Sequence, residues 1–218
     1  MKYIMSILFA VSVFQVQSQS AKEILQKTIN YHDPTREWKT LKATFEYAEK
    51  QPNGEVRKTI FKLDNAANSH YLNRGDKEAY RVNGKYEVEV LMGDKEAARG
   101  KMLRSYYVYL WGLPMKLQDK GTTLLDEVIT ENVKGVDCFK IRVKYEKETY
   151  AFFITKDTHQ MVAYQFMKND GSGKGENIYL EGEVTVGRMK IPKARSWYSI
   201  PDDTFLGTDV LVKGILSN

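Results

Sequence analysis

The feature that most constrains the fold is a two-residue alternation of apolar and polar side chains that recurs along most of the chain. It begins after Trp38, where Leu41, Ala43, Phe45 and Tyr47 alternate with polar residues. This period places the apolar side chains on one face of a β-strand. Turn signals interrupt it about every 8–12 residues, a spacing typical of an all-β sandwich or barrel.

The predicted strands form two groups. The first is an antiparallel meander over 41–47, 56–63, 70–73, 78–82 and 86–91. The second covers 124–133, 138–145, 149–155, 161–168, 177–186 and 189–200. A twisted sheet of about ten strands rarely stays flat. We therefore predict a mainly β (α+β) fold with one large, curved antiparallel sheet or unclosed β-barrel and helices on its concave face.

Two helices are expected. Ser20 and Glu23 have the spacing of a capping box, an apolar stripe follows over 24–29, and Asp33-Pro34 ends the helix. The second helix carries an apolar stripe from Leu103 to Trp111. Gly112 is expected to end it in a left-handed conformation. The helices would fill or cover the sheet, and the apolar loop 113–117 would lie at the mouth.

The N-terminus has the parts of a secretory signal peptide. Lys2 precedes an apolar run over 4–14, and small residues follow. The run is shorter than the ~20 residues of a membrane span. We predict a signal peptide over 1–18, cleaved after Ser18 or Ser20, and a single domain over 19–218. The protein is therefore expected in the periplasm or outside the cell.

Charge and cysteine content exclude several classes. The formal net charge is +5, but acidic and basic residues are interspersed, which indicates a solvated surface rather than a nucleic-acid site. A weak preference for anionic membrane surfaces stays open. The one cysteine, Cys138, cannot form an intramolecular disulfide and is expected to be a buried small hydrophobe rather than a nucleophile.

No catalytic, metal or cofactor motif stands out. The segment 170–175 lacks the first Gly and the Ser/Thr of a phosphate-binding loop and precedes a strand, so it is expected to be a hairpin tip. His32, His70 and His159 lie apart without a metal-ligand spacing. There is no nucleophile elbow. We predict no catalytic residues, metal or cofactor, although scattered catalytic groups stay open.

Aromatic and apolar residues are abundant, with 14 Tyr, 9 Phe, 3 Trp and 8 Met. Several strands are apolar on both faces, which fits either a fully packed core or a concave cavity for an acyl chain or similar ligand. The residues that we expect in such a cavity are Phe45, Phe61, Tyr86, Val88, Tyr107, Trp111, Leu113, Met115, Phe152, Tyr164 and Phe166.

The order of elements resembles the periplasmic lipoprotein-carrier superfamily, with its LolA/LolB-like fold. The chain is also similar to secreted proteins of that fold from Bacteroidota-type bacteria. The segments that carry the resemblance are 21–29, 38–45, 109–115, 153–158 and 187–192. The resemblance implies an unclosed barrel in the Gram-negative cell envelope. It also implies an arginine inside the barrel that helps hold a closed state; the sequence does not identify which one.

Three functions follow as hypotheses. The first is a non-enzymatic binder or carrier of a hydrophobic ligand, an acyl chain, a lipid or a lipoprotein, with a membrane surface as a further partner. The second is a solid-core structural or interaction protein of the envelope. The third is a hydrolase with scattered catalytic residues. We expect a monomer that does not bind nucleic acid.

Overall fold

The computed structural model describes residues 19–85 and 87–217; the expected signal peptide lies outside the described residues. The helices are α1 (Ala21–His32), η1 (Glu37–Thr40), α2 (Ala97–Gly112) and η2 (Met115–Gln118). The strands are β1 (Lys42–Lys50), β2 (Val56–Asp64), β3 (Ser69–Arg74), β4 (Glu78–Asn83), β5 (Glu87–Met92), β6 (Thr123–Leu124), β7 (Ile129–Val133), β8 (Val136–Lys144), β9 (Glu148–Thr155), β10 (Met161–Lys168), β11 (Gly175–Val186), β12 (Met189–Ile200) and β13 (Phe205–Leu216). No helix in these two ranges has the length and apolar character to cross a membrane.

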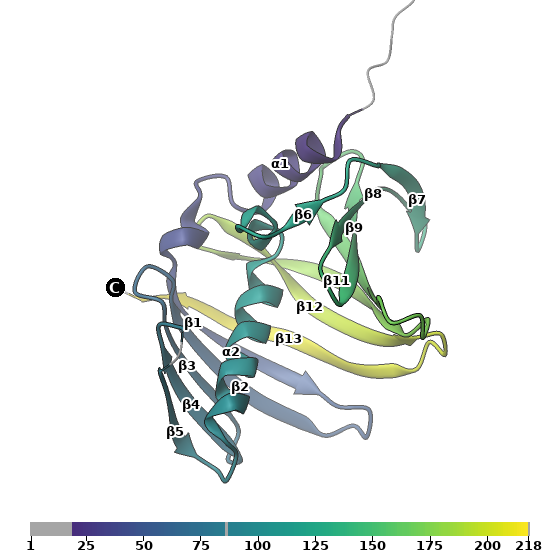
Figure 1. The fold of residues 1–218 in the computed structure, drawn as a ribbon. Helices are drawn as coiled ribbons and strands as arrows, with labels where there is room; N and C mark the ends of the chain where they lie inside the picture. Colours follow the sequence, from purple (N-terminus) through teal and green to yellow (C-terminus); the bar gives the residue numbers. More distant parts are fainter. Residues whose placement is uncertain (1–18, 86, 218) are drawn as a thin grey trace, which may run out of the picture.

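One antiparallel sheet contains all the strands of the described chain. Its order is β5-β4-β3-β2-β1-β13-β12-β11-β10-β9-β8-β6, and β7 pairs with β8. The sheet curves into an unclosed half-barrel, with α2 inside the curve and α1 across one end (Figure 1). The backbone of α2 runs close to β3, β4 and β5, and its large side chains reach further, to β1 and β2. The predicted fold class, an open curved sheet with helices on its concave face, is confirmed.

The main core lies on the concave face, where α2 meets β1 and β2. Phe45 and Tyr47 each stack on Trp111, and Tyr107 packs against Phe61. These are pairs between a helix and a strand, so aromatic burial is what holds α2 inside the curve.

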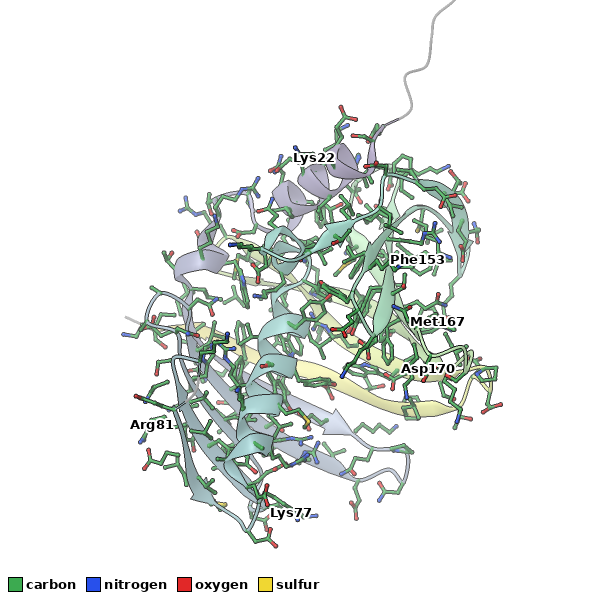
Figure 2. All side chains as sticks on the ribbon, viewed as in Figure 1. Lys22, Lys77, Arg81, Phe153, Met167 and Asp170 are labelled. Atoms are coloured by element: carbon green, nitrogen blue, oxygen red, sulfur yellow. The ribbon has the colours of Figure 1, made fainter. Side chains whose placement is uncertain are left out.

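A smaller cluster lies on the opposite face of the sheet. It contains Cys138, Ala151, Phe153 (labelled in Figure 2) and Ala163. Phe152 belongs to the main core, and adjacent strand residues point to opposite faces. Cys138 is fully buried in this cluster, as expected for a small hydrophobe.

The predicted strand over 124–133 is wrong, because the structure divides it into β6 and β7. Leu124 pairs with Val143 and Ile129 pairs with Lys140, so the segment between them is longer than the stretch of β8 that it passes. The excess residues bulge out of the ladder, as in a β-bulge.

The last strand, β13, was missed by the sequence analysis although it joins the two halves of the sheet between β1 and β12. Two glycines interrupt its alternation. A Cβ at Gly214 would lie 2.5 Å from Val186 and 3.4 Å from Phe45. Gly207 has a φ of 144°, in the region that favours glycine. Close packing and backbone conformation thus require glycine at these two positions, and the glycines interrupt the apolar–polar alternation from which a strand is predicted.

Gly112 is the last residue of α2, but it does not adopt the left-handed conformation that the sequence analysis predicted. The following residue, Leu113, is extended, and Gly112 has no positive φ. A Cβ at this position would lie 2.4 Å from the Trp38 ring. Gly112 is therefore needed because η1 approaches the helix closely.

The helix α1 is anchored by a buried histidine at its C-terminal end. The His32 Nε2 atom accepts a hydrogen bond from the Met161 amide at 3.0 Å, so Nδ1 carries the proton and donates to the Lys190 carbonyl at 2.8 Å. The neutral ring thus joins α1 to β10 and β12. Burial lowers the pKa of His32 below its usual value of 6.5.

We predict that His32→Ala lowers the free energy of unfolding by about 2–4 kcal/mol, because two buried backbone groups lose their partner. In the wild type the unfolded chain binds the His32 proton more readily. Stability should therefore fall as the pH drops below about 6.5, and the variant should lose this part of the pH dependence. Urea denaturation between pH 5 and 8 measures both effects. His159→Ala, which removes the 3.3 Å contact with Gln19 and a ring contact with Phe139, is the control; an equal loss in both variants would contradict the assignment.

Candidate functional site

The helix α2 covers only part of the concave face, and a cavity of about 380 Å³ remains between it and the strands β9–β12. Its walls are largely aromatic, and we call it the aromatic cavity. It is lined by Tyr106, Tyr109, Leu110, Tyr150, Tyr164, Phe166, Glu176, Ile178 and Trp197. Tyr106 is 42% exposed although it lies on the inward side of α2, because it faces this open space rather than packed atoms.

A second hollow of about 420 Å³ adjoins the aromatic cavity, since Tyr106, Glu176 and Trp197 line both. We call it the charged mouth. It is lined by Glu49, Lys50, Gln51, Arg57, Arg74, Arg99, Met102, Leu103, Tyr106, Tyr107, Glu176, Trp197, Leu206, Gly207 and Asp209. It lies at the end of the half-barrel away from α1; in Figure 2, Lys22 marks the end with α1 and Lys77 the opposite end.

Glu49 on β1 is the first centre of an ionic network in the mouth. The Arg57 Nε atom donates to its carboxylate at 2.8 Å, Arg74 Nη2 does so at 3.4 Å, and the Tyr107 hydroxyl donates from α2. Burial disfavours the ionised form of Glu49. The Tyr107 hydrogen bond and the arginine charges outweigh burial and lower its pKa.

Glu78 on β4 is the second centre. It accepts from Arg74 at 2.9 Å, from the Tyr80 hydroxyl at 3.0 Å, and from Arg99 of α2 through Nε at 2.7 Å and Nη2 at 3.0 Å. Burial opposes ionisation here too, but the bonds from Arg99 and Tyr80 and the charge of Arg74 lower the Glu78 pKa to about 2. The two glutamates thus attach α2 to the sheet at two places, Glu78 through Arg99 in the first turn and Glu49 through Tyr107 in the C-terminal half.

Two further carboxyls face the mouth without such partners. Within the described ranges, neither Glu176 nor Asp209 forms a side-chain hydrogen bond or an ion pair within 4 Å. Burial and the charge of Glu49 raise the pKa of Asp209 to about 7. Burial and the charge of Glu148 also raise the pKa of Glu176.

The C-terminal end of α2 is held by a buried arginine. Arg195 on β12 has no solvent exposure, its guanidinium lies 3.6 Å from the centre of the Trp111 ring, and Nη2 donates to the Leu110 carbonyl at 3.1 Å. That carbonyl belongs to the last turn of α2, where helical carbonyls lack an amide partner and a positive charge is favourable. Arg195 Nε and Nη1 have no hydrogen-bond partner among the described residues.

The predicted cavity residues divide between the main core and the cavity walls. Tyr164 and Phe166 line the aromatic cavity, and Tyr107 lines the charged mouth. The others belong to the main core or pack against it: Phe45, Phe61, Val88, Trp111, Leu113, Met115 and Phe152. Tyr86 lies outside the described residues. With no ligand present, their role in binding stays a prediction.

The residues that the sequence analysis missed are mostly polar or lie on the inward side of α2. Arg195 and Trp197 share one face of β12, so strand alternation places a charged side chain on an apolar face. A charged side chain on an apolar strand face is unusual, and this mismatch could have identified Arg195 from the sequence. Glu176, Asp209 and Tyr106 offered no comparable signal, because their exposure depends on where α2 ends its cover of the sheet. Among the described residues, no group of three or more His, Cys, Asp or Glu side chains could hold a metal ion.

Comparison with known proteins supports the fold. A family described as of unknown function, DUF6503, matches residues 2–214. No curated protein matches the sequence. A LolA superfamily protein from Nitrosomonas europaea superposes with a TM-score of 0.58 at 10% identity, covering 92% of this chain and 95% of that one. A domain from Vibrio parahaemolyticus, provisionally named for outer membrane lipoprotein sorting, gives 0.52 at 10% identity, covering 90% and 92%. The chain therefore has a LolA-like fold.

We predict that Glu78→Gln destabilises the protein by about 2–4 kcal/mol, because two arginines lose a buried counter-charge. The stability that ionised Glu78 provides should disappear as the pH falls from about 4.5 towards 2, and the variant should show less of this acid loss. Denaturation at pH 7 and pH 3 measures both. Glu89→Gln removes only the exposed pair with Arg81 and should cost less than about 1 kcal/mol. Equal costs would contradict the role of Glu78.

Proposed function

Since this chain belongs to the DUF6503 family, whose function is unknown, we propose from its own site that it is a non-enzymatic binder or carrier of a hydrophobic ligand. The observation that carries the proposal is the aromatic cavity. Its volume of about 380 Å³ lies within the range of about 300–1,000 Å³ usual for small-molecule sites, which are also mostly apolar. A ligand that moves into it gains roughly 25 cal/mol for each Å² of apolar surface removed from water.

The two ends of α2 are attached differently, and this supports a movable lid. The N-terminal turn is fixed by two hydrogen bonds from Arg99 to ionised Glu78, and Tyr107 in the C-terminal half donates one to Glu49. The C-terminal end has the Arg195 hydrogen bond to the Leu110 carbonyl and the stack on Trp111. Since Tyr106, Tyr109 and Leu110 form the α2 wall of the cavity, a shift of this end would widen it. Arg195 thus fits the barrel arginine that the LolA-like resemblance implies.

The alternative functions have less support. A solid-core interaction protein would have a filled interior, whereas here a cavity of about 380 Å³ remains on the concave face beside α2. A hydrolase would need histidines and carboxylates that converge in a cleft. No histidine is among the described residues that line the aromatic cavity or the charged mouth.

The cellular location follows from two lines of support. The N-terminal sequence has the features of a secretory signal peptide, and the similar domain from Vibrio parahaemolyticus is provisionally named for lipoprotein sorting. We therefore propose that the protein works in the cell envelope, in the periplasm or outside the cell, where acyl chains of lipids or lipoproteins are available ligands. A monomeric state and contact with a membrane surface stay predictions.

We predict that the mature protein binds the neutral fluorescent probe N-phenyl-1-naphthylamine in the aromatic cavity. Ile178→Phe and Phe166→Trp add volume to its walls, and together they should weaken binding at least about tenfold by excluding the probe. Val212→Trp, at a side chain that is 66% exposed on β13, is the control and should bind like the wild type. Denaturation midpoints verify folding. Equal affinity in the filled variant and the wild type would place the probe elsewhere.

We also predict that Arg195→Met speeds release of the bound probe by about 10-fold or more, because one charge-assisted hydrogen bond that closes the lid is lost. Met fills similar space without a buried charge, so folding should persist. Stopped-flow fluorescence measures release, and hydrogen exchange should increase at 109–113 but not at 97–103. The control is Arg188→Met, at a side chain that is 70% exposed. Unchanged release and exchange would show that Arg195 does not control the lid.

A further inference from the structure

Apart from Lys50, which is exposed, the charged groups of the charged mouth fall into two sets that differ in whether their bonding is complete. The arginines that line it, Arg57, Arg74 and Arg99, all bond to Glu49 or Glu78, whose pKa values are lowered. The three arginines and the two ionised glutamates of this set together carry a net charge of +1. Glu176 and Asp209 lack hydrogen-bond and ion-pair partners among the described residues, so the unmet demand in the hollow is for a hydrogen-bond donor or a cation.

Glu176 lies where the aromatic cavity meets the mouth. In the sheet it stands opposite Phe166 of β10 and Ser199 of β12. Together with Tyr106 and Trp197 it lines both hollows. A carboxylate flanked by aromatic rings is the usual surrounding of a bound ammonium group, because both the negative charge and the ring faces attract a cation.

Asp209 provides the second carboxyl, on β13. It pairs with Arg195 on the neighbouring strand β12 and with Glu49 on the other neighbour, β1. No nitrogen of Arg195 lies within 4 Å of the Asp209 carboxylate. The Arg195 guanidinium is instead turned to Trp111 and the Leu110 carbonyl. Asp209 therefore lacks an ion-pair partner within 4 Å, although Arg195 on the neighbouring strand keeps Nε and Nη1 without a hydrogen-bond partner among the described residues.

The Tyr164 hydroxyl is a further polar group in the wall of the aromatic cavity, and Arg195 is its charged neighbour. Tyr164 lines the aromatic cavity and is 1% exposed, but its hydroxyl has no well-formed hydrogen bond within the described chain. A buried hydroxyl without a partner is costly. A polar atom of a ligand in the cavity would satisfy it.

We propose that the ligand is an amphiphile with an ammonium head group, which lies between Glu176 and Asp209 and against Tyr106 and Trp197, while its apolar part occupies the aromatic cavity. This inference rests on the proposed function and specifies the head group. An anionic head would meet two unpaired carboxyls at the same place. It would find the arginines of the mouth already bonded to Glu49 and Glu78.

The test compares three ten-carbon amphiphiles with different heads, each below its micelle concentration: decyltrimethylammonium, decyl sulfate and decanol. Isothermal titration calorimetry with the mature wild-type protein should give about tenfold or tighter affinity for the cation than for the sulfate. Glu176→Gln and Asp209→Asn should each weaken binding of the cation several-fold and leave decanol affinity within about twofold. Glu181→Gln, an exposed position on the same strand, should change neither.

The outcomes separate the head group from the cavity. If decyl sulfate binds as tightly as the cation, or if both carboxyl variants keep full affinity for the cation, the proposed head group is wrong, and decanol binding still supports a hydrophobic carrier. If none of the three amphiphiles binds, the carrier function fails as well. The two carboxyl variants are neutral and nearly isosteric. A folding defect in one therefore leaves the other as the test, and near-ultraviolet circular dichroism checks both.

Discussion

An unclosed antiparallel sheet cannot bury its own concave face, and the structure depends on how that face is covered. In this chain α2 covers the β1–β5 side through aromatic stacking such as Tyr47 on Trp111. The β9–β12 side has equally apolar residues, but α1 covers it only at one end of the half-barrel, and Phe166 and Ile178 line the aromatic cavity. A single helix is too narrow for so wide a sheet, so a solid core and a cavity coexist in one half-barrel.

The same constraint explains where buried charge is found. A lid helix held by apolar contacts alone would lack a defined position on a broad apolar surface. Here Glu78 bonds to Arg99 near one end of α2, and Arg195 bonds to the Leu110 carbonyl near the other. Directional bonds to ionised groups define the position of the helix, since they are lost when it shifts by a small distance. The two attachments also differ in number of bonds, because Arg99 donates two hydrogen bonds to Glu78 whereas Arg195 donates one to the helix.

Local periodicity was sufficient to predict the architecture but not the site. Alternation around Phe45 and the capping box at Ser20 are properties of short segments, so they are visible in one sequence. The strand β13 was missed because Gly207 and Gly214 meet demands made by distant residues. The same limit applies to Glu176, whose accessibility depends on the edge of a helix about seventy positions away in the chain. Arg195 was the exception, because an arginine on the apolar face of a strand is anomalous in the sequence itself.

The capping box of α1 has a consequence for maturation of the chain. The Ser20 amide and hydroxyl both donate to the Glu23 carboxylate, at 2.8 and 3.0 Å, and the Ser20 carbonyl accepts from the Ile24 amide. Removal of an N-cap costs about 1 kcal/mol of helix stability. Of the two expected cleavage positions, the one after Ser18 retains this cap, together with the contact of Gln19 with His159. A cut two residues later would leave the first helix without its N-cap, so of the two expected positions the one after Ser18 preserves α1 better.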